Sequence, residues 1–322
     1  METIYNKYTS RDWSKAFEVF ESTGEIQDAL LVYFDQHGKW VDFPYFTVCS
    51  DDSLLAQQTI PPGRLVRTLE DGRKILLSSF RESSEELIEI DYHHVIGEVD
   101  ILSTKEFRAP NLVTVDGGMS IDTPKVIHLP SLEKVNCGFD VKTATIFDLP
   151  NLKRIDGYLT VNAADIIYVP KLVTVMRELE AVCARTFHAP RLRRVGPLNL
   201  NTAAIIHLPN LKTAGPIEVD YATMFDAPKL EIVYGQIDAM NTIFFHAPLL
   251  KEVESLDAGF AVSFHASNLK TVRENLDAGS AVIFDALKLE EVGGKLTLRR
   301  EALEAAVKAG SRAAMAKVAE EI

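Results

Sequence analysis

The fold is decided by a phrase that appears in full at residues 149–170, LPNLKRIDGYLTVNAADIIYVP. Its opening, an apolar residue followed by Pro, a polar residue and Leu, returns every 19 or 20 residues. The Pro stands at Pro110, Pro130, Pro150, Pro170, Pro190, Pro209, Pro228 and Pro248, and Ser267 and Leu287 take its place in the last two copies. About ten copies in register indicate a stack of identical small units rather than an ordinary domain.

Two segments inside each copy alternate apolar and polar residues, Leu159-Thr160-Val161 and Ile167-Tyr168-Val169 in the copy quoted. Such alternation is typical of a strand with one buried face. A unit of 20 residues is too short for a βαβ unit, which needs about thirty residues, or for an α-solenoid repeat, which needs about 33. We therefore predict a mainly β fold. It is a right-handed parallel β-solenoid of about ten 19–20-residue coils over residues 96–298, with coils about 4.8 Å apart.

The stretch LKRIDGYLTV at residues 152–161 resembles the leucine-rich-repeat-like and receptor L-domain families. In those families a Leu, a small apolar residue and a Gly precede a short Leu-x-Val or Leu-x-Ile strand. The resemblance covers about residues 97–298. It implies a solenoid that presents a recognition surface, and it does not specify a ligand.

A solenoid needs capped ends, because an open end exposes core and strand edges. Residues 299–322 are predicted to form a helical cap whose apolar stripe comprises Leu303, Ala306, Val307, Ala314 and Val318. Gly310 and Ser311 leave open whether this run is one helix or two short ones. Residues 1–95 lack the repeat and are predicted to form an α+β cap, with a helix over about 11–22, strands near 29–34 and 74–77, and a turn at Asp71-Gly72. A separate recognition or effector domain is the alternative.

Equivalent outward positions in a solenoid line up in columns. The column inside the first strand is mostly acidic and contains no base; it comprises Asp100, Ser120, Asp140, Thr160, Glu180, Asn199, Glu218, Asp238, Asp257, Asp277 and Thr297. Like charges side by side cost stability, so the acids Asp140, Glu180, Glu218, Asp238, Asp257 and Asp277 are the predicted partner-binding surface. A solvated face kept charged for solubility is the alternative.

The column inside the second strand gathers five of the chain's eight histidines. It comprises Arg108, His128, Asp148, Tyr168, His188, His207, Asp226, His246, His265 and Asp285. His and Asp are both metal ligands, but they do not form a closed tetrahedral set here, so no metal is predicted. A hydrogen-bonded polar ladder or a partner contact remains open for this second polar column, in particular for His128, His188, His207, Asp226, His246, His265 and Asp285.

Composition narrows the function classes. The chain has 46 acidic and 34 basic residues, a net charge of -12, which argues against direct nucleic-acid binding and favours a basic partner. The three widely spaced cysteines do not suggest a disulfide framework or a metal motif, and the first residues show no signal-peptide pattern, so we expect a cytoplasmic protein. No apolar run is long enough for a membrane span, and no nucleotide-binding or hydrolase motif occurs, so no membrane association, cofactor or catalytic residue is predicted.

The sequence thus favours a non-enzymatic, protein-binding repeat scaffold that presents an acidic strand face to a basic protein. One alternative is a DNA mimic, in which evenly spaced carboxylates imitate phosphate rows and inhibit a DNA-binding protein. Another is a carbohydrate-active β-helix enzyme that uses paired carboxylates. Oligomeric state and partner identity are not predicted.

Overall fold

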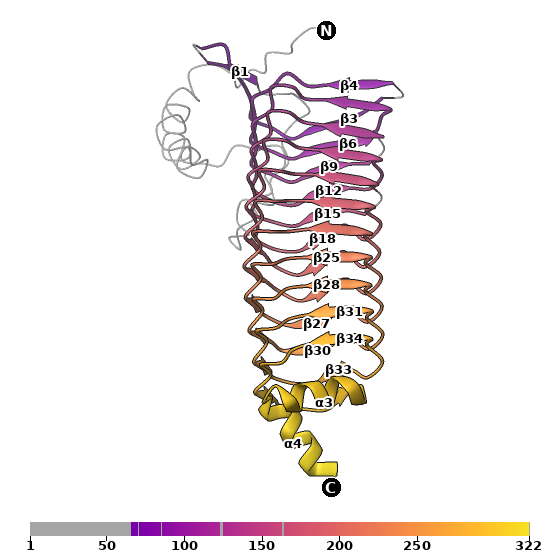
Figure 1. The fold of residues 1–322 in the computed structure, drawn as a ribbon. Coiled ribbons are helices and arrows are strands. Elements are labelled where there is room, and N and C mark those ends of the chain that lie inside the picture. The colour runs from indigo at the N-terminus through magenta and orange to yellow at the C-terminus, as the bar shows by residue number, and fades with distance from the viewer. Residues whose placement is uncertain (1–65, 70, 85, 123–124, 163, 322) are drawn as a thin grey trace, which may run out of the picture.

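The structure is a computed structural model that describes residues 66–69, 71–84, 86–122, 125–162 and 164–321. It is a mainly β, parallel solenoid of about eleven turns, as the repeat predicts. Each turn contributes one short strand to each of three sheets, which we name sheets A, B and C and which form the walls of a rod (Figure 1). The predicted helix over 11–22 and the strand near 29–34 lie outside the described residues.

Sheet A has thirteen strands. They are β1 (Val66–Thr68), β2 (Lys74–Leu76), β5 (His94–Val95), β8 (Thr114–Val115), β11 (Lys134–Val135), β14 (Arg154–Ile155), β17 (Thr174–Val175), β20 (Arg194–Val195), β23 (Thr213–Ala214), β26 (Ile232–Val233), β29 (Glu252–Val253), β32 (Thr271–Val272) and β35 (Glu291–Val292). The alternation in the sequence indicated only two strands per turn, since a two-residue strand is too short to show alternation.

Sheet B has twelve strands and sheet C has eleven. Sheet B comprises β3 (Phe80–Ser83), β6 (Val99–Ser103), β9 (Met119–Ile121), β12 (Phe139–Val141), β15 (Leu159–Val161), β18 (Leu179–Glu180), β21 (Leu198–Asn199), β24 (Ile217–Glu218), β27 (Gln236–Asp238), β30 (Ser255–Asp257), β33 (Leu276–Ala278) and β36 (Leu296–Leu298). Sheet C comprises β4 (Leu87–Glu89), β7 (Glu106–Arg108), β10 (Val126–His128), β13 (Ile146–Asp148), β16 (Ile166–Tyr168), β19 (Thr186–His188), β22 (Ile205–His207), β25 (Met224–Asp226), β28 (Phe244–His246), β31 (Ser263–His265) and β34 (Ile283–Asp285).

The core is a continuous column of apolar side chains inside the rod. Each strand directs its central or flanking apolar residues inward, as in β12, where Phe139 and Val141 are buried on either side of the half-exposed Asp140. Phenyl rings of successive rungs stack, with centroids 4.7 Å apart for Phe225 and Phe245. One turn has too little apolar surface to form a core alone, so stability comes from neighbouring turns that bury one another.

The repeated Pro phrase forms the corner after each sheet C strand. In the copy quoted above, the Leu152 N–H donates to the Leu149 carbonyl at 3.3 Å, which places Pro150 at the second position of a four-residue turn, where its fixed φ is favourable. The Asn151 amide then donates to the Pro130 carbonyl of the preceding turn at 2.6 Å. The phrase therefore both turns the chain and ties consecutive rungs together.

Both ends of the described stack are visible in Figure 1. At the N-terminal end, β2, β3 and β4 already belong to sheets A, B and C, so the stack begins before residue 96. The strand expected near 74–77 and the turn at Asp71-Gly72 are both present, with β1 and β2 pairing antiparallel around Gly72, whose φ is 84°.

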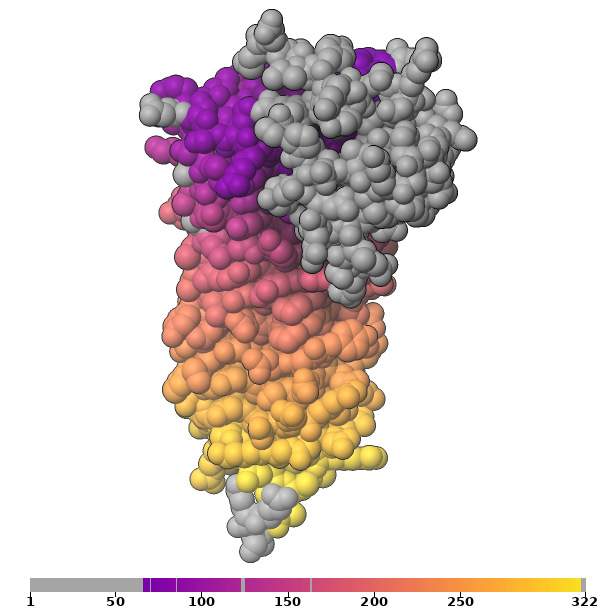
Figure 2. Space-filling model, turned by 180° about the vertical axis from the view of Figure 1, so that it is seen from behind, coloured from indigo at the N-terminus to yellow at the C-terminus, as the bar shows by residue number. Residues whose placement is uncertain are grey.

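At the C-terminal end, α3 (Arg300–Lys308) lies against β34 and α4 (Arg312–Glu321) against β35. Gly310, with φ of 89°, separates the two helices, so the run is divided as one of the two alternatives predicted. Of the predicted stripe, Ala306 and Ala314 are buried, and the Ser311 hydroxyl donates to the Leu289 carbonyl at 2.6 Å. In the space-filling view, the described residues form an elongated rod (Figure 2).

Candidate functional site

The predicted acidic column lies on the outward face of sheet B, in register from rung to rung. Asp140 pairs in the ladder with Ser120 and Thr160. Further along, Asp238 pairs with Asp257, and Asp257 with Asp277. Neighbouring strands lie about 4.8 Å apart, so three carboxylates of one sign stand side by side. Glu180 and Glu218 occupy the same column in β18 and β24, on either side of Asn199.

Three of these aspartates also hold the corner that follows their strand. The Oδ1 atom of Asp257 accepts the Gly259 N–H at 2.9 Å, and Asp277 accepts the Gly279 N–H at 2.9 Å. Asp238 does the same for the Met240 N–H at 3.4 Å. This local bond explains why Asp is tolerated at three successive rungs, since Asp and Asn favour turns by bonding the backbone two residues on.

The six acids predicted to bind a partner have no cationic partner among the described residues. None of Asp140, Glu180, Glu218, Asp238, Asp257 and Asp277 forms an ion pair with a residue in the described ranges. Burial raises the pKa of Asp238, and Asp220 and Asp257 add to this, while the Met240 N–H opposes it. Burial likewise raises the pKa of Asp140, against the nearby Lys142. At Asp140 and Asp238 the column therefore holds negative charge at a cost in stability.

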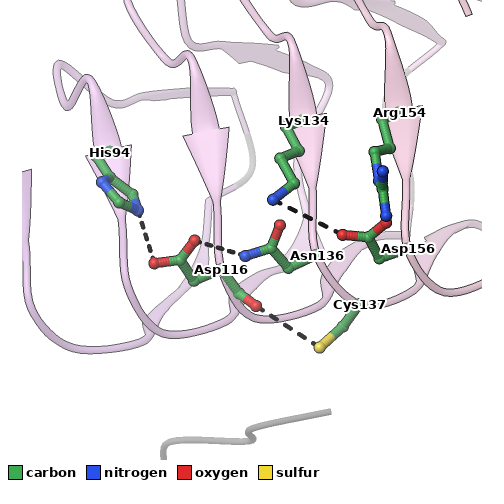
Figure 3. Close-up of polar contacts among 7 residues, drawn as sticks. All are labelled: His94, Asp116, Lys134, Asn136, Cys137, Arg154 and Asp156. Carbon is green, nitrogen blue, oxygen red and sulfur yellow. Dashed lines mark hydrogen bonds and ion pairs between the residues drawn. The ribbon is translucent and has the colours of Figure 1, made fainter. Parts of the chain in front are cut away.

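The neighbouring corner between sheets A and B shows the opposite arrangement (Figure 3). There His94 Nε2 donates to Asp116 Oδ2 at 2.8 Å, and the Asn136 amide donates to Asp116 Oδ1 at 2.8 Å. Arg154 pairs with Asp156 on the same side of the rod. Acids at this corner have side-chain hydrogen-bond or ion-pair partners, whereas the six acids of the predicted binding surface form no ion pair with a described residue.

Sheet B also lacks bases next to the acidic column over half of its length. The segments that form its outward face from β18 to β33 contain no Lys or Arg; they are residues 178–182, 197–201, 216–220, 236–240, 255–259 and 275–279. They contain seven acids, Glu178, Glu180, Glu218, Asp220, Asp238, Asp257 and Asp277. Bases appear towards the two ends of the sheet. Near the first rungs Arg81 pairs with Asp100 at 3.1 Å and Lys142 with Asp122 at 2.7 Å, and at the last rung Lys295 and Arg299 flank β36.

The second polar column lies on the outward face of sheet C, again in register. Three of its histidines contact an aspartate on the next rung: His128 Nδ1 donates to Asp148 at 2.8 Å, His207 Nδ1 donates to Asp226 at 2.9 Å, and His265 Nδ1 lies 3.6 Å from Asp285.

His188 and His246 have ring contacts instead. The His188 ring is stacked between Tyr168 and His207, with centroids 5.4 and 5.9 Å away. Burial lowers the pKa of His188, and His207 lowers it further. The ring of His246 meets that of His265 edge to face. Contacts of this kind are those expected of a polar ladder, and no group of three or more His, Cys, Asp or Glu in the described ranges is arranged to hold a metal ion.

A third column on sheet C was missed from the sequence. It comprises the first outward residue of each sheet C strand: Leu87, Glu106, Val126, Ile146, Ile166, Thr186, Ile205, Met224, Phe244, Ser263 and Ile283. Most of its apolar members are exposed. The available signal was the doubled apolar residue, as in Ile166-Ile167 and Phe244-Phe245, because two adjacent strand residues cannot both face inward.

Within the described part of the chain, no helix has the length and apolar composition needed to cross a bilayer. In comparisons with known proteins, no protein-family model, no curated protein sequence and no solved structure matches this chain. The site must therefore be interpreted from its own chemistry.

Proposed function

We propose that the protein is a non-catalytic, protein-binding repeat scaffold whose acidic column on sheet B binds a basic segment of another protein. The observation that carries this proposal is the row of carboxylates that form no ion pair with a described residue, on a face without bases between β18 and β33. A partner's Lys and Arg side chains would supply the counter-charges that the described residues do not provide.

The energetics of the column support this use. Asp238 is partly removed from water and lies between acids, so its charge is destabilising in the unbound protein. A cation placed beside it would relieve that repulsion, and the gain appears only in the complex. Residues kept at a cost in stability are common at binding surfaces. The resemblance of the repeats to leucine-rich-repeat-like and receptor L-domain families, which are used for recognition, agrees with this proposal.

Binding to a basic peptide tests the proposal directly. A fluorescent Lys-rich peptide is titrated with the full chain and with a variant carrying Asp238→Asn, Asp257→Asn and Asp277→Asn. Asn keeps an oxygen acceptor at the Oδ1 position, so the corner hydrogen bonds survive and only charge is lost. We expect the variant to bind about tenfold more weakly, since each exposed ion pair contributes about 0.2–1 kcal/mol.

A matched control variant distinguishes the loss of charge in the acidic column from the same loss of charge elsewhere on the protein. Glu254, Glu274 and Glu291 are exposed, lie off the column and form no ion pair with the residues described here, and their change to Gln removes the same charge. Equal weakening by the two triple variants, or no weakening by the column variant, would contradict the proposal. A competition experiment tests the DNA-mimic alternative. That alternative requires the protein to displace duplex DNA from a DNA-binding protein, and the displacement must weaken as the salt concentration rises.

A further inference from the structure

Sheet C presents a long apolar surface that the proposed function does not use. In the apolar column defined above, Val126, Ile166, Ile205, Phe244 and Ile283 are all exposed, with Phe244 and Ile283 each at 50%. At the adjacent corner, Ile243, Val262 and Val282 are exposed as well and widen the surface towards the C-terminal end. The five column side chains named first recur on alternate rungs, and Ile146, Thr186, Met224 and the buried Ser263 occupy the same position on the rungs between them. Apolar exposure repeated along one face in this way marks an interaction surface rather than the scattered apolar exposure of an ordinary monomer.

The size of this surface matches a protein interface. Eleven strands at about 4.8 Å give a face about 50 Å long, and three-residue strands at about 3.3 Å per residue make it about 10 Å wide. The plane is thus about 500 Å² before corner residues are counted. Two such faces together provide about 1,000 Å², which reaches the lower bound expected of a specific interface.

The polar column beside the apolar column identifies the partner as a second copy of the chain. Its charges are complementary to those of the same column in reverse order. We consider two rods packed face to face and antiparallel, related by a two-fold axis that passes between β19 and β22. Each column then faces its own copy in reverse order. Arg108 faces the second copy's Asp285, Asp148 faces His246, and Tyr168 faces Asp226. In the apolar column, Ile166 faces Met224.

Charge also selects this register over its neighbour. An axis centred on β19 would place Asp148 opposite Asp226 and Glu89 opposite Asp285, so that acids repel. Moving the two-fold axis by half a rung spacing, from between β19 and β22 to β19, therefore converts attraction into repulsion. An axis centred on β22 would place His128 opposite Asp285 and Asp148 opposite His265, which is also complementary. The Arg108–Asp285 pairing is therefore what distinguishes the register with the axis between β19 and β22.

We propose that sheet C is the interface of an antiparallel, two-fold symmetric homodimer of this chain. The apolar side chains that begin eight of the eleven sheet C strands form its dry seam, and the His, Asp, Arg and Tyr side chains form a matching polar seam. The inference is independent of the proposed function, because the acidic column lies on sheet B, which stays accessible in such a dimer.

Sedimentation velocity of the full chain at increasing concentration tests the proposal. We expect a dimer that is lost when Phe244 or, separately, Ile166 is changed to Glu, because either change places charges in the dry seam. Tyr234 is 69% exposed at the corner after β26, off sheet C, and Tyr234→Glu is the matched control that should leave the dimer intact. Far-UV circular dichroism verifies that each variant is folded.

A charge swap tests the register. Arg108→Asp alone and Asp285→Arg alone should each weaken dimerisation by about tenfold, and the double variant should restore it, because the two positions face each other only in the antiparallel arrangement. A wild-type chain that is monomeric at about 100 μM overturns the proposal. So does a dimer that persists in both Glu variants, or a charge swap without rescue.

Discussion

The rings of Phe245 and Phe264 stack inside the rod with centroids 4.3 Å apart and planes 6° apart, on β28 and β31 of sheet C. Phe225 and Phe284 continue the stack on the rungs before and after. The ring spacing follows the strand spacing, because each Phe stands perpendicular to the sheet at the centre of its strand. Four aromatic rings therefore form one stack in the core. Loss of either central ring, Phe245 or Phe264, removes stacking contacts with two neighbours.

Phe245→Ala should markedly lower the guanidinium concentration at which the protein unfolds. The ring is fully buried, and truncation of a buried Phe costs about 3–5 kcal/mol through lost transfer energy and a cavity. Phe244→Ala, one residue away on the outer face, is the control. In protein dilute enough to be monomeric, it should change the free energy of unfolding by less than about 1 kcal/mol. Guanidinium unfolding followed by circular dichroism measures both, and similar losses would contradict the assignment of the two faces.

Asp238→Asn should stabilise the protein while it weakens partner binding. The pKa of Asp238 is raised in the folded state, mainly by burial, so the folded protein binds a proton before the unfolded chain does. Wild-type stability is therefore reduced above the folded-state pKa and recovers as the pH falls towards 3.8. The Asn variant lacks this penalty.

We expect the free energy of unfolding of Asp238→Asn at pH 7 to exceed that of the wild type by about 0.5 kcal/mol, after allowance for the partial exposure of the site. The difference should shrink in acid, and thermal melts between pH 3 and pH 7 measure it. Asp277→Asn, at an exposed position of the same column, should show a smaller gain. If Asp238→Asn were less stable than the wild type at neutral pH, the charge of Asp238 would not be destabilising in the folded protein and the prediction would be wrong.

Asp257→Ala should be less stable than Asp257→Asn by about 1 kcal/mol. Both changes remove the charge, but only Ala removes the acceptor for the buried Gly259 N–H, which is then left without its 2.9 Å bond. The comparison therefore isolates the structural role of the aspartate from its electrostatic role. Chemical denaturation of the two variants is the measurement, and equal stability would show that the corner does not depend on this bond.

Gly117→Ala should be strongly destabilising, and Gly118→Ala should not. A Cβ at Gly117 would lie 2.5 Å from the Gly97 carbonyl oxygen on the preceding rung, whereas a Cβ at Gly118 would lie 3.5 Å from its nearest atom, the Gly138 carbonyl oxygen. Backbone cannot yield as a flexible side chain does, so we expect a loss of about 1–3 kcal/mol or more at Gly117. Thermal unfolding of the adjacent pair measures the effect, with each glycine serving as the reference for the other.

The sequence predicted the architecture because the repeat fixes the register: once each turn has the same length and the same inward residues, columns must form. Asp238, Asp257 and Asp277 could therefore be placed side by side from spacing alone, and the structure aligns them. Their bonds to backbone amides could not be predicted, since these depend on the path of the corner. The third strand of each turn was missed because two residues carry no periodicity.

The exposed apolar column was missed for a different reason. The alternation rule assigns one buried residue to the centre of each sheet C strand, and Phe245 satisfies it. A second apolar residue beside it, such as Phe244, then appears as part of the core pattern, although the pleat directs it outward. The doubled apolar residue was the available signal, and the fixed register then places these extra residues along one face.

The tolerance of the corners to length has a further consequence. The turn from Leu179 to Leu198 is one residue shorter than the turn before it, yet Leu179 still pairs with Leu198 and Glu180 with Asn199. Whole turns can thus be duplicated or deleted without disturbing their neighbours, each changing the rod by about 4.8 Å. Such a chain behaves as a molecular ruler with a fixed graduation, and gene duplication could set the distance between its two ends in discrete steps.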